Sequence, residues 1–115
     1  DMDGTLADTD PVHRLAFVEA LAPHGIDVDE EFYRTRISGR TNRVIGRMLF
    51  PDWTIEAIDR FAQEKEALFR RMAGTITPTP GLMDLLDWAE AGGVSIALVT
   101  NAPRDNVAHL LDALS

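Results

Sequence analysis

The hydrophobic positions in the first two thirds of the chain repeat at helical spacing. Apolar residues three and four apart, bounded by polar caps and by glycine or proline breaks, predict helices at 10–22, 30–37, 41–49 and 54–73. None of this stretch shows the short continuous or alternating apolar pattern of a strand. We therefore expect residues from about 10 to 77 to form consecutive helices.

The pattern changes at Thr77-Pro78-Thr79-Pro80-Gly81, a connector that its prolines stiffen because each fixes φ and restricts the preceding residue. Thr79 is expected to cap a helix that starts at Pro80 and ends at Gly92-Gly93. The next segment, 94–100, is short, rich in β-branched residues and almost wholly apolar, which is typical of a strand buried on both faces of a parallel sheet. A final helix follows Pro103.

A helical block between α/β pieces predicts an insertion. We assign 1–9 and 78–115 to an α/β core and 10–77 to an inserted all-helical cap subdomain. The alternative is a single mixed domain with no mobile cap, and the proline-rich connector favours the insertion. The chain starts at Asp1 and stops within a helical pattern, so we expect it to be truncated at both ends.

Composition narrows the class of protein. The 115 residues include 19 acidic and 11 basic side chains, a net charge of −8 that argues against a nucleic-acid partner. The absence of cysteine excludes a disulfide framework and a thiolate zinc site. No apolar run approaches the length of a membrane span, so we expect a cytoplasmic globular domain with no membrane partner. Oligomeric state is not indicated.

The first residues, Asp1-Met2-Asp3-Gly4-Thr5-Leu6, carry the clearest chemistry. In an extended segment Asp1 and Asp3 point to one side and Met2 to the other. Two unit charges 4 Å apart repel by about 4 kcal/mol at an effective dielectric of 20, so the pair needs a cation or a shared proton. Oxygen ligands suit Mg²⁺, and Gly4 permits an abrupt turn whose amides can face an anion.

This run resembles the nucleophile motif DxDGT[LV] of the haloacid dehalogenase superfamily in its phosphatase form. Both aspartates, the glycine, the threonine and the following leucine match. An ordinary acidic turn or half of a calcium loop is the alternative, but the twelfth position, where a calcium loop carries Glu, is Val12. The resemblance implies a Rossmann-like parallel-sheet core, with a strand expected to precede Asp1.

A second motif follows the apolar segment 94–100, which ends in Thr100 and is followed by Asn101. In the superfamily a strand ends in Thr or Ser, whose hydroxyl holds the transferring phosphoryl group, and Thr100 matches that position. A hydroxyl with free amides at a helix start can bind an anion. Read alone, Thr100 would be interpreted as a helix cap; the two motifs together favour membership of the superfamily.

Weaker similarities extend over the rest of the chain. Asp8-Thr9 followed by His13 resembles the first cap helix of the β-phosphoglucomutase and phosphoglycolate phosphatase branch. Thr79-Pro80-Gly81 resembles the return from cap to core, and Ser38-Gly39-Arg40-Thr41 lies where such caps carry a substrate-recognition loop.

Five arginines fall between 34 and 47 in a chain with a single lysine. Arg40 and Arg43, nearest the Gly39 turn, are candidates for binding the polar end of a phosphorylated metabolite. Most of the five are better interpreted as a solvated helix face. His13 is a weaker candidate for substrate binding.

The resemblance implies a Mg²⁺-dependent phosphatase that acts on a small phosphomonoester metabolite. Asp1 would form an aspartyl phosphate, and Asp3 would protonate the leaving oxygen and then activate water. Gly4, Thr100 and Asn101 would hold the phosphoryl group, and Asp1 and Asp3 would also bind the metal.

The family also uses a later lysine beside the phosphate and a later acidic pair at the metal. Lys65 lies inside the helical stretch and no such pair follows Thr100, so we expect the lysine and the acidic pair beyond Ser115. A phosphomutase of the β-phosphoglucomutase type uses the same residues and stays open, as does a non-catalytic module that kept the fold. A dehalogenase is disfavoured, because those members typically lack the second aspartate that Asp3 supplies.

Overall fold

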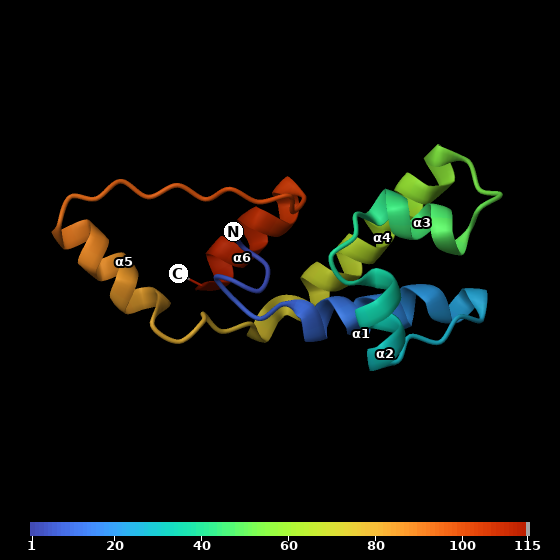
Figure 1. Cartoon of the computed structure of the whole chain (residues 1–115), viewed down its shortest axis with the longest axis horizontal. Helices are drawn as coiled ribbons and strands as arrows, with labels where there is room; N and C mark the ends of the chain where they lie inside the picture. The colour runs from blue at the N-terminus through green and yellow to red at the C-terminus, as the bar shows by residue number, and fades with distance from the viewer. Residues whose placement is uncertain (115) are drawn as a thin grey trace. The chain divides into compact units, whose positions relative to one another are not determined.

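The computed structural model describes residues 1–114, apart from the side chain of Thr75 (Figure 1). In chain order the elements are α1 (Asp10–Leu21), η1 (Ala22–His24), α2 (Glu30–Phe32), η2 (Tyr33–Ile37), α3 (Asn42–Leu49), α4 (Ile55–Met72), η3 (Ala73–Thr75), α5 (Leu82–Ala91) and α6 (Arg104–Leu114). None of the described helices combines the length and the apolar character that crossing a membrane requires.

The chain divides into two compact units. One is continuous, Pro11–Met72, and we call it the helical unit. The other, the discontinuous unit, joins Asp1–Asp10 to the chain from Ala73 onward. Residues 73–77 therefore group with the discontinuous unit rather than with the helical stretch in which the sequence pattern placed them.

The helical segments expected between 10 and 73 are confirmed. The Thr41 hydroxyl accepts a hydrogen bond from the Val44 amide at 3.3 Å and caps α3, and Thr54 caps α4 through the Ala57 amide at 3.2 Å. The segment predicted at 30–37 is α2 continued by the π-helical turn η2. These caps satisfy amides that would otherwise lack partners in the first turn, which is why each helix begins where it does.

The helical unit has its own apolar core, made of the buried residues Phe17, Leu21, Val28, Ile37, Ile45 and Phe61. Helices α3 and α4 pack closely, because Gly46 on α3 is buried against Ile58 on α4. Without a side chain at Gly46 the two helix backbones can approach each other. The apolar residues that recur at helical spacing in the sequence are thus the ones that meet in this core.

The discontinuous unit is built around the opening loop of the chain. Met2, Ala7 and Leu110 are completely buried together, and α6 supplies the last of these. The return segment is tied to the same loop, because Thr79 donates from its amide to the Leu6 carbonyl and from its hydroxyl to the Thr5 carbonyl, both at 2.8 Å. Chain segments far apart in sequence therefore hold one another.

The predicted start of the helix after the proline connector is wrong. Helix α5 begins at Leu82, and its N-cap is Gly81, whose φ of 85° lies in the left-handed region. The hydroxyl of Thr79, expected to cap a helix from Pro80, is used on the opening loop instead. A tertiary hydrogen bond has replaced the local one that the sequence pattern favours.

The strand predicted at 94–100, buried on both faces, is not confirmed within residues 1–114. The segment is unpaired, with Val94 47%, Ile96 60% and Val99 79% exposed, while Leu98 is partly buried against the cluster around Met2. A strand needs a neighbour to receive its backbone hydrogen bonds, and no described segment lies in that position. The parallel sheet of the expected α/β core is accordingly absent from residues 1–114.

We predict that Gly46→Ala destabilises the protein although alanine is the better helix former. A methyl group at position 46 would overlap the branched, buried Cγ2 of Ile58. Overpacking of this kind costs about 1–3 kcal/mol, more than the roughly 1 kcal/mol that alanine contributes in a helix. Urea denaturation measures the free energy of unfolding.

The matched control is Gly74→Ala, where a Cβ would meet nothing within 4 Å. Ile58→Ala removes the obstructing methyl, so adding Gly46→Ala to that variant should cost less than adding it to the wild type. Equal costs in the two backgrounds would show that the α3–α4 contact is not the cause.

Candidate active site

The two aspartates of the opening motif lie on either side of a buried side chain. Met2 is completely buried, Asp1 is exposed and Asp3 is half-buried. The Asp1 carboxylate accepts a hydrogen bond from the Met2 amide at 2.8 Å. Burial of Met2 fixes the backbone between the two carboxylates, so neither can leave this part of the loop.

A tight turn follows Asp3. Gly4 has a φ of 72°, which is strained for residues with a Cβ, and its amide donates to the Ala7 carbonyl at 2.8 Å. The amides of Thr5 and Leu6 donate back to the Met2 carbonyl at 3.1 and 2.9 Å. The amide of Gly4 is therefore committed to the loop, so its expected role toward a phosphate stays a prediction.

Thr9 holds the Asp3 carboxylate. Its hydroxyl donates to Asp3 Oδ1 at 2.6 Å, and Thr9 is completely buried. A hydrogen bond of this length to an ionised oxygen belongs to the strong, charge-assisted class. Sequence reasoning used Thr9 only as part of a resemblance; the signal available was a small hydroxyl residue six positions after an aspartate.

Thr100 lies in a pocket of about 500 Å³ within the discontinuous unit. The pocket is lined by Leu98, Val99, Thr100, Ala102, Arg104 and Val107. The Thr100 hydroxyl accepts from the Ala102 amide at 3.1 Å, and Leu98 and Ala102 on either side of it pack against the cluster that contains Met2. Both sequence motifs are thus anchored to one apolar cluster, while Asn101 is exposed.

Arg104 was not among the residues singled out from the sequence. It is the first residue of α6 and contributes its guanidinium side chain to the Thr100 pocket. A cation beside a hydroxyl makes a pocket suited to an anion. The sequence signal was an isolated arginine just after Thr100-Asn101, which lies outside the arginine-rich stretch.

His13, in the helical unit, belongs to a buried polar network. Its ring stacks on Phe69 with centroids 3.9 Å apart, and its Nδ1 lies 2.7 Å from Lys65 Nζ. Lys65 is 2% exposed, forms an ion pair of 3.0 Å with Glu66, and Glu66 also accepts from Asn42 at 2.9 Å. Since a charged Lys65 can only donate, Nδ1 of His13 is the acceptor in this contact.

The two candidate arginines differ in their surroundings. Arg43 makes two parallel hydrogen bonds to Asp59, at 3.0 and 2.9 Å, which raise the pKa of Arg43 and lower the pKa of Asp59. Arg40 is exposed and has no ion pair within residues 1–114. Arg40 is therefore the candidate whose charge is available to a ligand.

The oxygen atoms of Asp1 and Asp3 are of the kind that Mg²⁺ prefers as ligands. Two carboxylates and the Asp3 carbonyl are hard oxygen donors, and Mg²⁺ commonly uses one or two protein carboxylates with water and phosphate oxygens. Among the described residues, no group of three or more His, Cys, Asp or Glu side chains gathers at one point. The residues fit Mg²⁺ as part of a coordination sphere.

The sequence profile of the haloacid dehalogenase-like hydrolases matches residues 1–115, so the match spans both motifs and the helical stretch between them. The chain belongs to this hydrolase family.

Related proteins of the family agree with this assignment. The chain is 33% identical over 123 residues to protein CbbY of Rhodobacter capsulatus, covering 98% of this chain and 53% of that protein. It is 31% identical over 126 residues to phosphoglycolate phosphatase 1 of Pseudomonas aeruginosa, covering 99% and 44%.

The crystal structure of CbbY from Rhodobacter sphaeroides in complex with phosphate superposes on this hydrolase-family chain with a TM-score of 0.86 and 29% identity. The similarity covers 99% of this chain and 54% of that one. The chain therefore spans about half the length of the relatives it matches.

We predict that Lys65→Met destabilises the helical unit by about 3–5 kcal/mol, because it breaks the buried ion pair between Lys65 and Glu66. The double variant Lys65→Met/Glu66→Gln removes both charges and keeps an acceptor for Asn42, so it should be the more stable of the two. Chemical denaturation of the wild type and both variants measures this. If the double variant were no more stable than the single one, the ion pair would not be the source of the cost.

Proposed function

We propose that this protein is a phosphatase that hydrolyses a small phosphomonoester through an aspartyl phosphate formed on Asp1. The observation that carries the proposal is the opening loop, where buried Met2 separates the two carboxylates and the Thr9 hydroxyl orients Asp3. The phosphatase named among the relatives and the phosphate held by the CbbY structure support the same chemistry.

In the first step a carboxylate oxygen of Asp1 attacks phosphorus, and the bond between phosphorus and the ester oxygen breaks. The Asp3 carboxyl group gives its proton to the departing oxygen, so an alcohol leaves. In the second step water attacks the phosphorus of the aspartyl phosphate while the Asp3 carboxylate takes its proton. Asp1 is regenerated and inorganic phosphate is released, so atoms and charge balance.

The phosphoryl oxygens would be held by the pocket around Thr100. Its hydroxyl, the neighbouring Asn101 and the guanidinium of Arg104 supply donors and positive charge. Arg104 adds a cation to the set of phosphate-binding residues inferred from the sequence.

Mg²⁺ would be held by the Asp1 carboxylate and the Asp3 main-chain carbonyl, with the remaining positions taken by water, phosphate and ligands from elsewhere in the protein. When bound, it would reduce the repulsion between the aspartates and a phosphate dianion. The side chains around Thr100 would still orient the phosphoryl group, and Asp3 would still transfer the proton.

The helical unit would act as a cap that closes over the substrate and selects it, with His13 and Arg40 directed at its polar end. Arg43 is a weaker candidate because Asp59 already occupies its guanidinium. In the full-length protein we expect residues 94–100 to pair as a strand of the parallel sheet, which would bury the side chains of Val94, Ile96 and Val99.

We predict distinct losses for the two aspartates. Asp1→Asn removes the nucleophile, so no phosphoenzyme should form with any substrate. Asp3→Asn removes the proton donor, which is typically worth about 10²–10⁴-fold for an alkyl phosphate. An aryl phosphate has a better leaving group and should lose much less. Single-turnover kinetics with one alkyl and one aryl phosphate measure these rates.

The wild-type protein should release phosphate from several sugar phosphates or from phosphoglycolate, and chelation of Mg²⁺ should abolish that release. Phosphoenzyme on Asp1→Asn, or equal losses of Asp3→Asn on both substrates, would contradict the assigned roles. Isomerisation of β-glucose 1-phosphate without phosphate release would identify a phosphomutase instead.

Thr9 is expected to act as a positioning residue for Asp3. Thr9→Val keeps the buried volume but removes the hydroxyl, so transfer to an alkyl leaving group should slow about 10-fold, the value of a hydrogen bond to a charged group. Thr9→Ser keeps the hydroxyl and should restore the rate. The ratio of alkyl to aryl rates is the readout, because a merely structural defect would slow both substrates alike and leave that ratio unchanged.

A further inference from the structure

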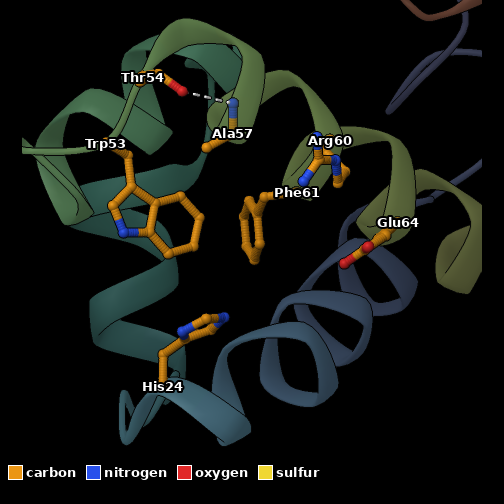
Figure 2. A pocket seen from close by; sticks show the side chains of 7 residues that line it. All are labelled: His24, Trp53, Thr54, Ala57, Arg60, Phe61 and Glu64. Carbon is orange, nitrogen blue, oxygen red and sulfur yellow. Dashed lines mark hydrogen bonds between the residues drawn. The ribbon is translucent and has the colours of Figure 1, made fainter.

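The helical unit contains a pocket that the proposed catalytic residues do not use. It has a volume of about 360 Å³, within the range of roughly 300–1,000 Å³ typical of small-molecule sites. The end of η1, the two residues before α4 and the part of α4 up to Glu64 line it: His24, Trp53, Thr54, Ala57, Arg60, Phe61 and Glu64 (Figure 2).

Three rings form the walls of this pocket. His24 meets Trp53 and Phe61 edge to face, with centroids 5.3 and 6.1 Å apart, and Trp53 meets Phe61 at 6.3 Å and 78°. Phe50 stacks on Trp53 at 3.9 Å and 11°, which fixes the indole from outside the pocket. These near-perpendicular rings form a rigid apolar wall that can receive a flat ring in the same geometry.

Two oppositely charged side chains line the pocket, Arg60 and Glu64, which lie one turn apart on α4 (Figure 2). They do not pair with each other, and neither has a hydrogen bond or ion pair within the described residues. The adjacent Asp59 is by contrast engaged by Arg43. The Thr54 hydroxyl is used in capping α4, and the His24 ring packs edge to face against Trp53 and Phe61.

This combination points to a ligand with a flat apolar body and two opposite charges close together. Side chains one turn apart have Cβ atoms about 5–6 Å from each other, so a long guanidinium and a carboxylate can converge on one small group. An α-amino acid carries its carboxylate and ammonium on a single carbon. We infer that the pocket binds a free aromatic α-amino acid, with its ring against Trp53 and Phe61, its carboxylate on Arg60 and its ammonium on Glu64.

Other ligand classes match the pocket less well. A nucleotide would offer a ring but would bring its phosphate beside the Glu64 carboxylate. A simple organic cation would suit the rings and Glu64 but would be repelled by Arg60. The inference is independent of the proposed phosphatase function, since no residue of this pocket takes part in that mechanism.

Binding is tested with L-phenylalanine on the full-length protein, by the shift in Tm and by tryptophan fluorescence. The part of the fluorescence change that is lost in Trp53→Phe reports on the pocket, because Trp53 lines it. We expect saturable binding at least about 10-fold tighter than that of phenylacetate, 2-phenylethylamine or AMP.

Charge variants identify the contacts. Arg60→Gln should weaken phenylalanine about 10-fold but should not weaken 2-phenylethylamine, whose ammonium it no longer repels. Glu64→Gln should likewise weaken phenylalanine but not phenylacetate. Arg47→Gln and Glu56→Gln, exposed residues outside the pocket, are the matched controls and should change neither.

Three results would overturn the inference. These are no saturable response up to the solubility limit of phenylalanine, equal affinity for phenylalanine and its two single-charge analogues, and tighter binding of AMP. The second would identify a merely apolar cleft, and the third a nucleotide site.

Discussion

Burial of Met2 between Asp1 and Asp3 is the constraint on which the candidate active site depends. Two carboxylates so near in sequence repel, and an exposed loop would relieve the repulsion by moving apart. Here the apolar side chain between them is completely buried with Ala7 and Leu110, and Thr9 holds Asp3 from the other end of the loop. The hydrophobic contact thereby stabilises an arrangement that electrostatics alone would oppose.

The helical half of the fold was predictable because its information is local. Threonine caps and a 3.6-residue apolar period specify where α3 and α4 begin and which faces they bury, and the structure agrees. The predictions that failed or were not confirmed concern residues whose structure depends on a partner far away in the sequence. Thr79 donates hydrogen bonds to two carbonyls of the opening loop. The apolar segment 94–100 forms no strand because no described segment lies beside it to pair with its backbone.

The candidate site was likewise predictable only where its signal is local. Short motifs were enough to place Asp1, Asp3 and Thr100 among the candidates, because each motif consists of adjacent residues. The partners of those residues were not visible: the Thr9 hydroxyl on Asp3, Lys65 against His13 and Asp59 on Arg43 all join positions whose proximity only folding creates. Sequence spacing gives residue types, whereas orientation and pairing come from tertiary contacts.

The discontinuous unit has a kinetic consequence. Its core joins Met2 and Ala7 to Leu110, so it cannot form until the ends of the helical unit between them have been brought together. Contacts within the continuous helical unit, such as that between His13 and Phe69, close shorter loops than the contact between Met2 and Leu110, so they cost less chain entropy to establish. A helical unit that folds first would hold Asp10 and Ala73 near each other and shorten the search for the rest. The stability of the helical unit would then set how quickly the opening loop reaches its final conformation.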